Sequence, residues 1–149
     1  MLRRPPRVQT FDYLGRYRYF VTMCVDRRRA LFVEPRLVSR ISGQILRTFG
    51  DGEFAILAMT FMPDHAHLLV EGLSESSDFR TTLRLVRRRS AAACPPELRP
   101  LWQDGYHERV LRGEDGAAGV IDYILNNPVK AGLVERAPDY PFSWSVRSR

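Results

Sequence analysis

Two extended stretches joined by a proline–aspartate pair constrain the fold of this chain most strongly. Residues 53–62 (EFAILAMTFM) are almost entirely apolar, which is typical of a strand covered on both faces at the centre of a sheet. Pro63 and Asp64 favour a tight turn, and residues 65–71 (HAHLLVE) resume an extended pattern. We therefore predict a β-hairpin around which the rest of the sheet is built.

The segments before this hairpin predict one strand and one helix. Residues 16–26 (RYRYFVTMCVD) alternate with a period of two, so that every second residue lies on one face of a strand. Pro35 then begins a stretch in which apolar residues recur at spacings of three and four, and Gly50 and Gly52 end it. The order up to the hairpin is therefore strand, helix.

The segments after the hairpin predict a helix, a strand and a last helix. Residues 74–93 form an amphipathic helical pattern, residues 106–111 a weaker strand pattern, and residues 114–127 a third helix that Pro128 should end. The complete order, βαββαβ followed by one helix, is the split βαβ arrangement. We predict an α+β, ferredoxin-like (RRM-like) fold: an antiparallel sheet with helices on one face, plus a C-terminal helix.

Length and composition agree with one folded domain. The chain has 149 residues, of which 44% are hydrophobic and 27% charged, and these values are ordinary for a globular protein. We expect an arm over residues 1–15 and a single domain over residues 16–149. No apolar run approaches the ~20 residues that cross a bilayer, and the basic start lacks the apolar segment of a signal peptide. We therefore expect no membrane association and a cytoplasmic location.

Positive charge indicates a polyanionic partner. The chain has 23 basic and 17 acidic residues, a formal net charge of +6, and Lys130 is its only lysine. Because a guanidinium can hold two phosphate oxygens at once, this arginine excess favours nucleic acid. A charged run can also be a solvated helix face, and that alternative stays open. The candidate DNA-binding residues are Arg80, Arg84, Arg87, Arg88 and Arg89 in the second helix and Arg16 and Arg18 in the first strand.

Four other residues could perform chemistry. His65 and His67 lie on the same side of a strand, where two imidazoles can bind a divalent cation, although an isolated His-x-His is more often accidental. Tyr123 and Asn127 are one helical turn apart at the edge of an apolar stripe. The tyrosine could be a nucleophile and the asparagine a third metal ligand. A half-buried tyrosine with a satisfied hydroxyl is the simpler interpretation of the same residues.

Three segments together carry a family resemblance. MTFMPDHAHLLVE, LWQDGYHERVLRGED and IDYILNNPVKAGLVERAPDYPFSWS closely resemble the single-tyrosine HUH transposases of the IS200-like superfamily, especially those associated with repetitive extragenic palindromes. The resemblance implies that His65 and His67 bind a divalent metal, Mg²⁺ or Mn²⁺, that Tyr123 is the nucleophile, and that Asn127 occupies the amide-ligand position. Many family members have the longer glutamine there, and a larger residue than Ala66 between the histidines.

The resemblance also implies an activity and a substrate. Such enzymes are single-stranded DNA endonucleases and strand transferases that act near small hairpins in DNA transposition. They cleave and rejoin by transesterification through a 5′-phosphotyrosine. The family contains both monomers and dimers, so a homodimer is one of the assemblies it allows.

Two other functions fit some of the same residues. The first is a binding module: a catalytically silent or domesticated protein that holds single-stranded DNA hairpins. The second is a hydrolase of small phosphoesters that uses the histidine pair alone, but the sequence lacks the carboxylates expected around such a site.

Overall fold

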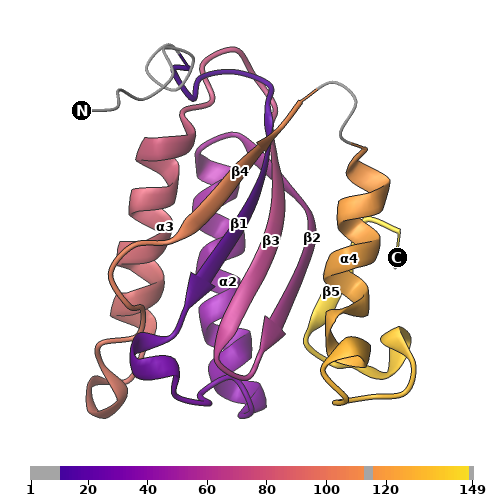
Figure 1. Cartoon of the computed structure of the whole chain (residues 1–149). Coiled ribbons are helices and arrows are strands. Elements are labelled where there is room, and N and C mark those ends of the chain that lie inside the picture. The colour runs from indigo at the N-terminus through magenta and orange to yellow at the C-terminus, as the bar shows by residue number, and fades with distance from the viewer. Residues whose placement is uncertain (1–10, 113–115, 148–149) are drawn as a thin grey trace, which may run out of the picture.

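The computed structural model describes residues 11–112 and 116–147, which form an antiparallel five-stranded sheet with helices on both faces (Figure 1). The strand order is β4-β1-β3-β2-β5. Its first four members have the order expected for the predicted ferredoxin-like fold. The strands are β1 (Arg18–Cys24), β2 (Phe54–Met62), β3 (His65–Gly72), β4 (His107–Leu111) and β5 (Ser143–Ser145).

Two long helices lie on one face of the sheet and the third lies on the other. α2 (Pro35–Asp51) and α3 (Phe79–Ala93) share one hydrophobic core with the sheet. α4 (Ala117–Lys130) packs through a separate core over β2, β3 and β5, and Figure 1 shows it standing apart from α2 and α3. Three 3-10 turns complete the helical elements: η1 (Asp26–Arg28), η2 (Pro96–Leu98) and η3 (Ala137–Asp139).

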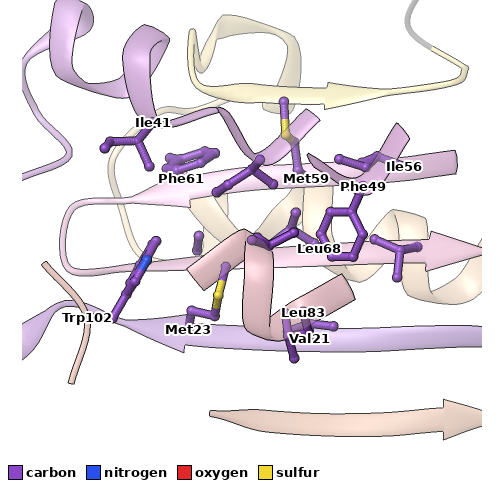
Figure 2. Packing of buried hydrophobic residues seen from close by; sticks show 14 of the residues in the cluster. Val21, Met23, Ile41, Phe49, Ile56, Met59, Phe61, Leu68, Leu83 and Trp102 are labelled. Carbon is purple, nitrogen blue, oxygen red and sulfur yellow. The ribbon is translucent and has the colours of Figure 1, made fainter. Parts of the chain in front are cut away.

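The main core fills the α2–α3 side of the sheet and contains most of the large apolar side chains (Figure 2). Tyr19 of β1 is fully buried there and stacks on Phe79 of α3, with ring centroids 3.8 Å apart. Burial raises the pKa of the Tyr19 hydroxyl well above its usual value, so the group stays neutral. Phe11 and Tyr13, from the predicted arm, also pack against this core, while residues 1–10 lie outside the described residues.

The second core is small because α4 buries only a narrow stripe. Leu69 of β3 points to α4, whereas Leu68 and Val70 point to the main core, as a period of two requires. The apolar stripe expected from the sequence is Val120, Ile121, Ile124 and Leu125, of which the first three are buried and Leu125 is partly buried at the edge. The buried residues of this second core are Ala58, Leu69, Leu111, Val120, Ile121 and Ile124.

A bulge in β2 changes which of its side chains point to each core. Ile56 pairs with Val70 and Ala58 pairs with the next residue of β3, Leu69, so Leu57 is an extra residue. The bulge lets Ile56 and Met59 both enter the main core. This explains why residues 53–62 show no clean alternation.

Two helix boundaries differ clearly from the predictions, and one strand is additional. α3 begins at Phe79, not at residue 74, because the Asp78 side chain caps it by accepting a hydrogen bond from the Thr81 N–H at 3.0 Å. β5 was not expected at all. Pro128 does not end α4, which continues to Lys130. A proline this close to the helix end removes a single intrahelical hydrogen bond, and the Ala131 N–H still bonds to the Asn127 carbonyl at 2.9 Å.

The predicted start of the last helix, Glu114, lies outside the described residues. None of the helices in residues 11–112 and 116–147 is long and apolar enough to cross a membrane.

Candidate active site

A row of polar side chains crosses the sheet on its α4 face. Thr22 of β1 is paired with His107 on one side and with His67 on the other. His67 in turn is paired with Thr60, whose hydroxyl is 2.7 Å from that of Ser143. Because residues directly opposite in neighbouring strands share a face, these five side chains line up on one surface.

The two histidines of β3 lie side by side in and next to this row. Their ring centroids are 4.7 Å apart. The Nδ1 atom of His67 is 2.8 Å from the Thr22 hydroxyl, and Nδ1 of His65 is 2.6 Å from Asp64 Oδ1. In both rings the hydrogen bond engages Nδ1, which presents Nε2 to a ligand. Metal-binding histidines in proteins are held through the second nitrogen in this way.

Burial keeps His67 neutral. The residue is only 8% exposed. Burial lowers the pKa of its imidazole to about 4, with a smaller contribution from the charge of His65. A neutral imidazole has the lone pair that a cation needs. His67 is therefore a competent ligand throughout the neutral range.

Asp64 is held from a second side by a cation. Arg28 donates from Nε to Asp64 Oδ2 at 3.0 Å, and its Nη2 also lies 3.0 Å from the same oxygen. Burial alone would raise the pKa of Asp64, but the hydrogen bonds from His65 and Arg28 outweigh it and the net pKa is lowered. The carboxylate thus stays ionised and fixes the ring of His65.

Tyr123 approaches the histidines from α4. Val120, Ile121 and Ile124 are buried against the sheet, which places Tyr123 on the flank of the helix, where it is 49% exposed. Its ring centroid lies 6.0 Å from that of His67 and 5.8 Å from that of Phe20. The tertiary structure therefore brings Tyr123 to the histidine pair.

Asn127 follows one turn later on the same helix and is half-buried. Its role as a third ligand stays a prediction. Across residues 11–112 and 116–147 there is no cluster of three or more His, Cys, Asp or Glu side chains that could hold a metal. A cation bound at the histidines would therefore complete its coordination with amide, water or phosphate oxygen.

The arginines of α3 lie away from this site. α3 packs on the main-core side of the sheet, whereas His67 and Tyr123 lie on the α4 side. Within α3, Arg84 and Arg88 are among the exposed residues. The predicted DNA-binding residues of this helix therefore do not lie at the histidine pair. They are Arg80, Arg84, Arg87, Arg88 and Arg89.

Two of these arginines contribute to the fold. The guanidinium of Arg87 is half-buried and donates to the Gln103 carbonyl at 2.9 Å. That of Arg80 lies over the ring of Tyr13, 4.0 Å from its centroid. These two guanidinium groups are thus already engaged in contacts within the protein.

The first strand carries two further predicted arginines. Arg18 projects from the α4 face of β1 and forms an ion pair of 2.7 Å with Glu71 of β3. Arg16 is exposed in the segment that precedes β1.

Phe20, Thr22 and Asp64 belong to the site but were not singled out from the sequence. The alternation of residues 16–26 already places Phe20 and Thr22 on one face, opposite Tyr19. That this face is the histidine face depends on the pairing of β1 with β3. A sequence pattern within one strand does not contain that pairing.

Most of the chain matches a known protein family. Residues 14–127, which include both histidines, Tyr123 and Asn127, match the family described as "Transposase IS200 like". The REP-associated tyrosine transposase of Escherichia coli (strain K12) is 28% identical over 125 residues, covering 84% of this chain and 74% of that protein.

Solved structures are similar to this chain in fold. The structure of the REP-associated tyrosine transposase bound to a REP hairpin has a TM-score of 0.76 and 26% identity, covering 96% of this chain and 81% of that one. A Deinococcus radiodurans crystal structure with 19% identity and a TM-score of 0.53, covering 84% of this chain and 97% of that one, shares the fold. Because the family match extends over residues 14–127, most of the chain, this chain belongs to the IS200-like transposase family.

Proposed function

We propose that this protein is a metal-dependent endonuclease and strand transferase of single-stranded DNA that works through Tyr123. The observation that carries the proposal is the position of that side chain. It is an exposed phenol whose ring is 6.0 Å from a buried, neutral histidine of the His65–His67 pair. Membership of a transposase family supplies the context of DNA transposition.

The reaction is a transesterification. The Tyr123 oxygen forms a bond to the scissile phosphorus, and the bond from phosphorus to the 3′ oxygen breaks. The phenol loses one proton and the departing 3′ oxygen gains one, which leaves a 5′-phosphotyrosine and a free 3′-hydroxyl. A second 3′-hydroxyl can reverse the step and join strands, since the covalent bond conserves the energy of the phosphodiester.

The residues of the site fit a divalent cation. Nε2 of His65 and of His67 are oriented for it by Asp64 and Thr22, and we propose the Asn127 amide oxygen as a third ligand. Mg²⁺ or Mn²⁺ held there would polarise the scissile phosphate and spread its negative charge. The protein's own part is to keep His67 neutral and to fix both rings.

The proposed substrate is a single strand that contains a hairpin. The solved REP-associated tyrosine transposase described above was determined with a REP hairpin bound, and a net charge of +6 suits a polyanion. A silent binding protein is not favoured, because an exposed tyrosine and both histidines lie together in one site.

A denaturing gel tests the activity directly. Labelled single-stranded oligonucleotides that carry the hairpins flanking the gene are incubated with the protein and either Mn²⁺ or EDTA. We expect a protein-sized covalent product with Mn²⁺ that EDTA and Tyr123→Phe both abolish. Tyr106→Phe is the matched control, because Tyr106 is comparably exposed but its ring lies beside Arg87 of α3.

Two outcomes contradict the proposal. A covalent product that persists in Tyr123→Phe would refute the nucleophile. A native-gel shift without any covalent product would support the hairpin-binding protein instead.

A further inference from the structure

Part of the α4 face of the sheet is left open. α4 packs mainly over β2, β3 and β5 and also covers Leu111 at the end of β4, whereas the rest of the β1–β4 side of that face carries a mixture of aromatic, polar and cationic side chains. Phe20 is paired with Arg109 there. The residues of this open surface are Arg18, Phe20, Thr22, His107 and Arg109.

A hollow of about 350 Å³ lies where this surface meets α4. Its volume is at the lower end of the range for small-molecule sites. One wall is the proposed nucleophile itself. The residues lining the hollow are Phe20, Arg109, Gly116, Gly119, Val120 and Tyr123.

Two glycines give the hollow its depth. A Cβ atom added at Gly116 or at Gly119 would meet no atom within 4 Å, and neither residue has a positive φ. Gly119 lies within α4, where glycine disfavours the helix relative to alanine. Neither packing nor backbone conformation therefore requires glycine at these positions. What their missing side chains provide is space beside Tyr123.

The remaining lining suits a flat, electron-rich ring. Phe20 contributes an aromatic ring that already contacts those of His67 and Tyr123, with centroids 5.5 and 5.8 Å away. Arg109 contributes a cation and Val120 an apolar wall. Aromatic stacking with an adjacent cation is how proteins hold the unpaired bases of single strands.

We propose that this hollow receives one unpaired nucleobase, that of a nucleotide next to the phosphate which Tyr123 attacks. The base stacks against Phe20, and Gly119 leaves room for it. The inference rests on the proposed function for the position of the phosphate, but base binding is measurable without cleavage. It makes Phe20 and Gly119 residues that position the substrate.

An abasic scan tests the proposal in the cleavage reaction. In the hairpin oligonucleotides described above, each nucleotide around the cleavage point is replaced in turn by an abasic residue. We expect one position at which the wild-type rate of adduct formation falls at least about tenfold, the effect of losing one stacked base.

Gly119→Leu should remove that dependence, because the leucine side chain fills the hollow. The variant should cut the intact oligonucleotide about as slowly as the wild type cuts the abasic one, and the abasic change should then have no further effect. Gly119→Ala should fall between the two. Gly50→Leu is the matched control, since Gly50 is also helical and open, but lies in α2.

A binding measurement separates this inference from the catalytic proposal. The same oligonucleotides carry 2-aminopurine at the sensitive position or, if nothing is cleaved, at each single-stranded position in turn. Stacking on Phe20 should quench its fluorescence in wild type and Tyr123→Phe, and Gly119→Leu should abolish the quenching. If DNA strands bind with this quenching but never become covalently attached, the proposed transesterification by Tyr123 is refuted and the proposed base-binding hollow is supported. Quenching or an abasic profile that Gly119→Leu leaves unchanged would overturn the pocket.

Discussion

The two faces of the sheet differ in how their side chains are used. On the α2–α3 face, large apolar residues such as Tyr19, Phe79 and Leu68 are fully buried. On the α4 face, a row of polar side chains crosses the strands and a hollow lies open beside Tyr123. β3 contributes to both, because Leu68 and His67 are neighbours in the chain. The α2–α3 face therefore supplies most of the stability, which permits the α4 face to remain polar and accessible.

The largest expected effect comes from removing a buried side chain on the α2–α3 face. Phe79→Ala removes a fully buried ring that stacks on Tyr19. We expect a loss of about 3–5 kcal/mol in the free energy of unfolding, measured by urea denaturation. Tyr123→Phe, on the open face, should change that free energy by less than about 0.5 kcal/mol. Equal losses in the two variants would contradict the division of roles between the faces.

The buried His67 on the α4 face should make the stability of the protein sensitive to acid. The pKa of His67 is about 4 in the folded protein and about 6.5 in an unfolded chain. The unfolded state therefore binds more protons as the pH falls below about 6.5, and stability is lost towards pH 4. Between pH 7 and pH 5 the expected loss is about 2 kcal/mol. Denaturation in EDTA at both pH values should show a smaller loss in His67→Asn.

Loosening one histidine should weaken metal binding without unfolding the protein. Asp64→Asn keeps the shape of the side chain but removes the charge that faces His65 and Arg28. We expect Mn²⁺ affinity to fall about 10- to 100-fold, as measured by calorimetry or by the electron paramagnetic resonance signal of free Mn²⁺. Asp51→Asn is the control, because Asp51 forms an ion pair with Arg89 on the other side of the sheet. An unchanged affinity in Asp64→Asn would show that the carboxylate does not position the ring.

The smallest expected effect concerns DNA affinity. Arg109→Gln, in the open surface, should weaken binding of the hairpin oligonucleotides and lower the slope of log affinity against log salt by about 0.7 for one phosphate contact. Arg84→Gln combined with Arg88→Gln, on α3, should have a smaller effect, because α3 lies on the opposite side of the sheet from Tyr123. A larger effect of the α3 pair, seen by fluorescence anisotropy, would mean that the DNA extends around to that face.

The elements with strong local signals could be predicted. The hairpin of β2 and β3, the apolar stripe of α4 and the sequence of elements along the chain up to β4 follow from periods of 2 and 3.6 residues and from turn residues. β5 could not be predicted, because its three residues have no periodicity and are ordered by pairing with β2. The Pro128 prediction was wrong because the tertiary position of α4, with Pro128 buried, outweighs the loss of one hydrogen bond.

The candidate site divides in the same way. His65, His67, Tyr123 and Asn127 stand out in the sequence through their types and spacing, and the family resemblance assigns their expected roles. Only the fold brings Tyr123 to His67, places Thr22 and Asp64 on the two Nδ1 atoms, and opens the hollow at Gly119. Periodicity and turn chemistry act over a few residues along the chain. Strand register and the position of a helix on the sheet depend instead on contacts between residues far apart in the chain. The residue types available for chemistry are therefore visible in the sequence, whereas their proximity in the site depends on the fold.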